Sequence, residues 1–164
     1  AGRPPLQADL IYENINGKEI PFSVINLHMK CCDSGLQRRQ KASKMLYDYL
    51  DDNYNEQPNI IVLGDWNDDT KDNPGEHCFE PFFQDDRFYF TTGKITFDIS
   101  QASYPKEPYV SFLDHIMVTE TLLPKESNYD VKTLPMGEFM GGYHIYEAYI
   151  SDHLPVLLSF STTN

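Results

Sequence analysis

The chain has 164 residues, 40% of them hydrophobic and 23% charged, which fits one globular domain better than two domains or a disordered chain. Its formal charge is −12, from 13 basic and 25 acidic residues. This balance disfavours a protein that holds nucleic acid through a broad basic surface, but it permits an enzyme that meets phosphate through a bound cation. No apolar run is long enough to span a membrane. No signal segment is visible, and since a removed one leaves no trace, the compartment is unknown and export stays open.

The cysteines Cys31, Cys32 and Cys78 are too few for a disulfide framework. The sequence has no CxxC pair, the spacing typical of a thiolate zinc site, and adjacent cysteines rarely form a disulfide with each other. We therefore expect free thiols. A bridge from Cys78 to one of the adjacent pair is the alternative for an exported protein.

A hairpin opens the chain. Residues 10–15 and 18–29 flank Asn16-Gly17, a dipeptide that favours the positive φ angles of a tight turn. The second arm is partly alternating and ends near His28. We expect it to be a strand that carries a histidine to the rim of a sheet.

An amphipathic helix is predicted over residues 34–51. Ser34 and Gln37 fit a capping box at its start. Apolar side chains then recur at spacings of three and four, which predicts a core-facing stripe of Ala42, Met45, Leu46, Tyr49 and Leu50. The opposite face carries Arg38, Lys41, Lys44 and Asp48, and we expect it to be solvated rather than to clamp phosphate.

Further strands are expected at residues 59–64, 111–119, 129–133 and 154–160. The aromatic stretch 79–92 predicts packing and a short strand or hairpin, and residues 137–146 form a loop of unassigned structure. Helices should cover one face of a mixed sheet, which gives an α/β (α+β) class.

Polar side chains follow or interrupt four of these strands. They are His28, then Asp65 with Asn67, then Asp114, then Asp152 with His153. Carboxylates among apolar residues are costly unless they are paired or bind metal, and four repeats of this arrangement indicate one shared site. Asp68 and Asp69 are instead interpreted as turn formers or helix caps.

Oxygen-rich ligands without sulfur suit Mg²⁺, with Mn²⁺ or Ca²⁺ as alternatives, better than Zn²⁺. If its strand neighbours that of His153, Asp114 can accept an imidazole N–H and fix the tautomer of the histidine. A divalent cation with two histidines in a carboxylate cleft suits phosphate-ester hydrolysis.

The segments Leu63-Gly64-Asp65-Trp66-Asn67, Ser111-Phe112-Leu113-Asp114-His115 and Ser151-Asp152-His153-Leu154-Pro155-Val156 resemble, in this order, motifs of the endonuclease/exonuclease/phosphatase superfamily. Asn26-Leu27-His28-Met29-Lys30 matches an earlier strand of that superfamily, and Arg38, Arg39 and Gln40 resemble the helix that follows it. The resemblance covers about residues 3–160.

The resemblance implies a role for each residue. His28 would be the first active-site histidine, Asp65 would orient the attacking water, and Asn67 would bind phosphate beside it. Asp114 would orient His153, which contacts the scissile phosphate. The metal site would draw on Asp152, with Asp65 and Asn67, and the substrate would be a phosphate ester of nucleic acid, phospholipid or sugar.

The fold implied is roughly the C-terminal half of a two-sheet, four-layer deoxyribonuclease-like sandwich. Residues 1–164 would be a single partial domain that lacks the N-terminal strands and their metal-binding Glu, and it would be a weak hydrolase alone. We expect an apolar sheet face that pairs with the missing half, self-associates, or is covered by Phe79, Phe82, Phe83, Phe88 and Phe90. The alternative function is a non-catalytic module with the same fold, which would lack divalent-cation binding.

Overall fold

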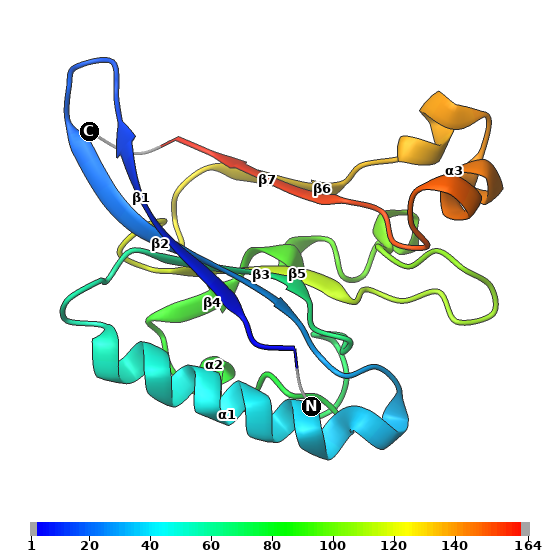
Figure 1. The fold of residues 1–164 in the computed structure, drawn as a ribbon, viewed down its shortest axis with the longest axis horizontal. Helices are drawn as coiled ribbons and strands as arrows, with labels where there is room; N and C mark the ends of the chain where they lie inside the picture. Colours follow the sequence, from blue (N-terminus) through cyan, green and yellow to red (C-terminus); the bar gives the residue numbers. More distant parts are fainter. Residues whose placement is uncertain (1–2, 162–164) are drawn as a thin grey trace.

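A computed structural model describes residues 3–161 as an α/β fold with two sheets (Figure 1). The larger sheet has the order β1 (Leu6–Glu13), β2 (Glu19–His28), β3 (Ile60–Asp65), β5 (Asp114–Thr119) and β4 (Phe88–Phe90), and the smaller sheet pairs β6 (Tyr129–Thr133) with β7 (Val156–Phe160). Helices α1 (Leu36–Asn53) and α2 (Glu80–Phe83) lie on one side of the larger sheet, and β6 and β7 lie on the other. The α/β class and the partial two-sheet sandwich are confirmed.

The strand pairing is mixed. β1 and β2 form the predicted antiparallel hairpin, and Gly17 supplies its positive φ of 77°. β2 and β3 run parallel, which requires the crossover that α1 provides. β3 and β5 are antiparallel, as are β4 and β5. The end of β2, the end of β3 and the start of β5 consequently meet at one edge.

Helix α1 begins differently from the prediction. A 3₁₀ turn over Asp33–Gly35 precedes it, and Gly35 occupies the N-cap position without a side-chain hydrogen bond. The capping box of Ser34 and Gln37 was therefore wrong. Close packing explains the glycine, because a Cβ at Gly35 would lie 2.8 Å from the Lys30 carbonyl oxygen.

The buried stripe of α1 is also rotated from the predicted one. Leu46 and Leu50 are buried as expected, but the stripe continues through Ser43 and Arg39. Ala42, Met45 and Tyr49 are exposed, the last two at 63% and 46%. Because of this rotation, the Arg39 side chain points into the protein and pairs with the Asp68 carboxylate.

An aromatic core fills the space between the larger sheet and its helices. Trp66 is fully buried, and its ring centroid lies 5.5 Å from that of Phe79, 5.9 Å from Phe82 and 5.2 Å from Phe90. Ile25 and Leu27 of β2 belong to the same cluster. The prediction that these phenylalanines could cover the opposite sheet face was wrong, because they pack on the helix side.

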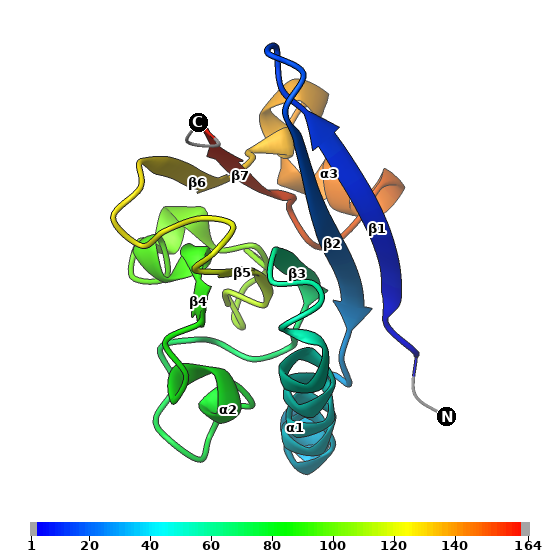
Figure 2. The ribbon, with the colours of Figure 1, turned by 90° about the vertical axis from the view of Figure 1, so that its left-hand side faces the viewer.

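The opposite face is covered only in part. Ile116 and Val118 of β5 pack against Val156, Leu158 and Phe160 of β7. Beyond this contact, β1 is exposed along its whole length, including Leu6 at 70%, Leu10 at 44% and Tyr12 at 47%. Figure 2 shows the β1–β2 hairpin extending past the small sheet. An exposed apolar face is thus present at this end of the larger sheet.

Residues 137–146, which the sequence left unassigned, contribute to a 3₁₀ segment (Met136–Met140) and to helix α3 (Tyr143–Tyr149). Over residues 3–161, no helix has the length and apolar character needed to cross a lipid bilayer.

Candidate active site

A close approach of β2 and β3 builds the base of the site. Gly64 lies opposite Leu27 and has a φ of +131°, and a Cβ there would sit 2.0 Å from the Leu27 carbonyl oxygen. Only glycine fits this position. The next pair in the register is His28 with Asp65, and Asp65 in turn lies opposite Asp114 of β5.

The side chains at this edge meet. His28 Nε2 lies 3.2 Å from Asp65 Oδ2, and His153 Nδ1 lies 2.6 Å from Asp114 Oδ2. Single ligand atoms of Asp65, Asp114 and His153 all fall within 4.8 Å of one another. Side chains from β2, β3, β5 and the segment before β7 therefore lie together at one edge of the sheet, and their roles in a site stay predictions.

Asn67 closes the site on the β3 side. Its backbone has a φ of 54°, a left-handed conformation that asparagine tolerates better than most residues. Its backbone N–H donates to Asp65 Oδ1 at 2.8 Å, and its side-chain amide donates to the Met29 carbonyl at 3.2 Å. The carboxylate of Asp65 is thus held between Asn67 and His28.

Asp152 is less closely tied to this group. Its side chain is exposed, and its carbonyl accepts a hydrogen bond from the Tyr143 hydroxyl at 2.6 Å. Within residues 3–161, the cluster of closely spaced acidic and histidine ligands contains Asp65, Asp114 and His153 but not Asp152. The metal-binding role of Asp152 stays a prediction.

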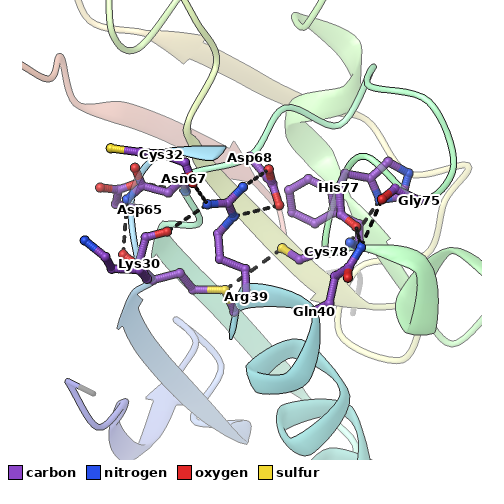
Figure 3. Close-up of polar contacts among 12 residues, drawn as sticks. Lys30, Cys32, Arg39, Gln40, Asp65, Asn67, Asp68, Gly75, His77 and Cys78 are labelled. Atoms are coloured by element: carbon purple, nitrogen blue, oxygen red, sulfur yellow. Dashed lines mark hydrogen bonds and ion pairs between the residues drawn. The ribbon is translucent and has the colours of Figure 1, made fainter. Parts of the chain in front are cut away.

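Arg39 forms a buried brace, a set of hydrogen bonds that links two segments next to Asp65 and Asn67 (Figure 3). Its guanidinium donates to both carboxylate oxygens of Asp68, at 2.9 and 2.7 Å, and to the carbonyls of Lys30 and Cys32, at 2.9 and 2.8 Å. The side chains of Arg39 and Asp68 are only 4% and 5% exposed. This brace ties the turn after β2 to the loop that carries Asn67.

Sequence reasoning missed this brace. The interpretation of Asp68 as a turn former or cap was wrong, although Asp69 does accept the Lys71 backbone N–H at 3.2 Å in a turn. The hydrophobic pattern of the helix gives no signal for a buried arginine at this position. Sequence reasoning also missed Tyr104, whose ring centroid lies 5.2 Å from that of His153.

The surroundings shift the pKa values of Asp65 and His153. Burial, with the nearby charge of Asp114 as a smaller cause, raises the pKa of Asp65 above its usual range. The hydrogen bond to Asp114 raises the pKa of His153, against an opposing effect of burial. His153 therefore favours the imidazolium form, with Nδ1 directed at Asp114 and Nε2 left for another partner.

The other histidine in the motif, His115, serves the core. It is 1% exposed, and its Nδ1 lies 2.8 Å from the Thr92 hydroxyl. Its Nε2 lies 3.0 Å from the Asp68 carbonyl oxygen and 2.9 Å from that of Phe112. Burial lowers its pKa. It anchors the segment before β5 and does not belong to the site.

The donor set fits a hard divalent cation. The two carboxylates of Asp65 and Asp114 come close to each other in a half-buried place, and the resulting repulsion contributes to the raised pKa of Asp65. A cation bound at Asp65 would offset this repulsion. The exposed carboxylate of Asp152 and the carboxamide oxygen of Asn67 are further donors of the oxygen type that Mg²⁺ prefers.

Comparisons with solved structures show the same fold. The catalytic domain of human Nocturnin, solved with a bound sulfate anion, aligns over 97% of this chain and 53% of its own, with 20% identity and a TM-score of 0.59. Zebrafish (D. rerio) TDP2, complexed with a single-strand DNA product, aligns over 95% and 62%, with 19% identity and a TM-score of 0.59.

The Xenopus laevis APE2 catalytic domain aligns over 98% of this chain and 56% of its own, with 19% identity and a TM-score of 0.55. The chain spans between half and two thirds of the length of these structures. No family model and no curated protein matches its sequence. The likeness confirms the deoxyribonuclease-like fold that the motifs implied.

Proposed function

We propose that this chain carries most of the active site of a metal-dependent phosphoesterase. The observation that supports the proposal most is the convergence of His28, Asp65, Asp114 and His153 at one sheet edge, with two histidine–carboxylate contacts. The bound sulfate of Nocturnin and the DNA product of TDP2 agree with a fold that receives phosphate groups. The substrate would be a phosphate ester of nucleic acid, phospholipid or sugar.

Each side chain has a task in this proposal. Asp65 accepts a proton from the attacking water and aims the water at phosphorus; its raised pKa makes it a stronger base than an exposed aspartate. His28 keeps the Asp65 carboxylate in place from the β2 side. The amide of Asn67 binds a phosphate oxygen.

The imidazolium of His153 neutralises charge that develops on the phosphate. Because Asp114 accepts from Nδ1, the Nε2–H is the atom that reaches a phosphate oxygen. Mg²⁺, or Mn²⁺ or Ca²⁺ in its place, would be held by Asp65, Asn67 and Asp152, and it would supply Lewis-acid polarisation of the phosphoryl group.

We also propose that residues outside this chain complete the metal site and cover the exposed face of β1 and β2, either from the rest of the sandwich or from a second copy. The chain alone would then be a weak hydrolase. Loss of one well-placed electrostatic group typically lowers the rate by about 100- to 1000-fold.

The test combines binding and catalysis. Mn²⁺ binding to the chain is measured by electron paramagnetic resonance, and hydrolysis of bis(p-nitrophenyl) phosphate is measured with excess Mn²⁺. Asp65→Asn should abolish hydrolysis and weaken Mn²⁺ binding, whereas the matched control Asp48→Asn, on the exposed face of α1, should change neither.

Absence of site-specific Mn²⁺ binding would support the non-catalytic alternative. Full-strength hydrolysis by the chain alone, abolished by Asp65→Asn, would contradict the proposal that outside residues are needed.

A further inference from the structure

Two adjacent thiols stand beside the candidate site. Cys31 and Cys32 follow His28 by three and four residues, in the turn between β2 and α1. Their Sγ atoms lie 2.8 Å apart, with Cys31 half-buried and Cys32 exposed. Cys32 has a φ of +71°, a conformation that residues with a Cβ seldom adopt. The turn thus holds two accessible sulfur atoms in contact.

The two thiols differ in reactivity. The Cys32 thiol donates to Cys31 Sγ, and Lys30 Nζ lies 3.5 Å from the same sulfur. The first contact, with a smaller contribution from Lys30, lowers the pKa of Cys31, and it raises the pKa of Cys32. Cys31 is therefore the better nucleophile of the pair.

The third cysteine provides an internal reference. Cys78 is 1% exposed, and its Sγ lies 4.0 Å from Met29 Sδ on the helix side of the sheet (Figure 3). Burial raises the pKa of its thiol strongly. Cys78 should stay reduced under conditions that oxidise the exposed pair.

We propose that Cys31 and Cys32 form a peroxide-sensitive pair that closes reversibly into a vicinal disulfide. A hydroperoxide is the oxidant. The Cys31 thiolate attacks a peroxide oxygen, the O–O bond breaks, water or an alcohol leaves after protonation, and Cys31 becomes a sulfenic acid. Cys32 Sγ then attacks Cys31 Sγ, the S–O bond breaks, and water leaves. The two thiols together lose two electrons and two protons, which reduce the peroxide.

Adjacency makes such a bond easy to reverse. Neighbouring Cα atoms are about 3.8 Å apart across a trans peptide, closer than the roughly 4.4–6.8 Å found for ordinary disulfides. The bond is therefore strained, and strained, exposed disulfides are the ones that cellular thiols reduce readily. The pair suits a switch and not a structural crosslink.

The brace connects this switch to the site. Arg39 Nη1 donates to the carbonyls of Lys30 and Cys32, which flank Cys31, while the rest of the guanidinium holds Asp68 next to Asn67. Closing the ring requires rotation of the Cys31–Cys32 peptide, whose carbonyl belongs to Cys31. We expect this rotation to move the Cys32 Cα and, with it, the adjacent Cys32 carbonyl that Arg39 binds. Oxidation should therefore loosen Asp68 and Asn67. An effect on catalysis rests on the proposed function, but the thiol chemistry does not.

The experiment treats the whole chain with hydrogen peroxide, blocks free thiols with iodoacetamide, and measures peptide masses. The peptide that contains both cysteines should lose the mass of two hydrogen atoms and escape alkylation, and dithiothreitol should reverse the change. Cys78→Ser should behave as the unsubstituted chain does. Cys32→Ser should accumulate a dimedone-reactive sulfenic acid, and Cys31→Ser should react roughly tenfold more slowly.

A disulfide from Cys78 to Cys31 or Cys32 would overturn the proposal. Oxidation of the Cys31→Ser variant at the same rate as the unsubstituted chain would also overturn it.

Hydrogen exchange tests the connection to the site. Oxidation should increase exchange at residues 65–69, and unchanged exchange in a chain with the closed disulfide would refute the link through Arg39. Absence of site-specific Mn²⁺ binding in both redox states would contradict the proposed function only, since peptide masses and hydrogen exchange decide the thiol proposal.

Discussion

Replacement of Arg39 by methionine should strongly destabilise the folded chain. Methionine preserves much of the volume and the helix propensity of arginine, so α1 itself should tolerate it. The carboxylate of Asp68, 5% exposed, would then be buried without a partner, and two carbonyls would lose their donor. Removing one member of a buried ion pair costs about 3–5 kcal/mol. Because small domains are stable by only about 5–15 kcal/mol, this is a large share of the total.

The matched control is Lys44→Met on the same helix. Lys44 is 61% exposed and pairs with Asp48 one turn away. Exposed pairs of this kind contribute about 0.5 kcal/mol or less. Urea unfolding can follow the fluorescence of Trp66, the single tryptophan, which is fully buried.

A double variant separates the lost contact from the unpaired charge. Arg39→Met combined with Asp68→Leu should recover much of the stability, because both charges are then absent. Equal costs for Arg39→Met and Lys44→Met, or a double variant no more stable than Arg39→Met, would refute the reasoning.

Three further predictions concern the site and the exposed face. The raised pKa of His153 means that its pair with Asp114 stabilises the fold in full below about pH 6.5, and that this contribution is lost as the pH rises through the raised value. Asp114→Asn should lower that pKa in an NMR titration without divalent cations, and an unchanged pKa would contradict the assignment. Gly64→Ala should lower the free energy of unfolding by at least about 1–3 kcal/mol because of its backbone conformation, and the clash with Leu27 adds to this cost. The control Gly93→Ala, whose new Cβ has no atom within 4 Å, should change it by about 0.5 kcal/mol or less. Leu10→Glu should reduce any concentration-dependent association in analytical ultracentrifugation, and association unaffected by it would place the contact elsewhere.

Elements with strong local signals could be predicted from the amino-acid sequence. The continuous apolar run before Gly64 predicted β3, and Asn16-Gly17 predicted the hairpin. The sequence also predicted that His28, Asp65 and His153 share a site, because a charged or polar group after an apolar strand has few stable alternatives to a common polar edge. The repetition of this arrangement at four strands was what indicated the common location.

Tertiary structure decided which face of α1 is buried. The 3.6-residue period fitted a stripe through Ala42, Met45 and Tyr49, yet the helix is rotated toward Arg39 and Ser43. A buried arginine has no signature in a hydrophobic pattern, because its place depends on a carboxylate, Asp68, that lies 29 residues away along the chain.

Tertiary structure also decided the roles of chemically identical residues. Asp65 ends β3 and Asp68 follows three residues later, but Asp68 neutralises Arg39 in the interior and Asp65 faces His28 at the rim. His115 and His153 both follow an aspartate, but one fills the core and the other meets Asp114. These assignments depend on which strands pair and in which register, and pairing between distant segments is set by the burial of the whole sheet and not by any one of its residues.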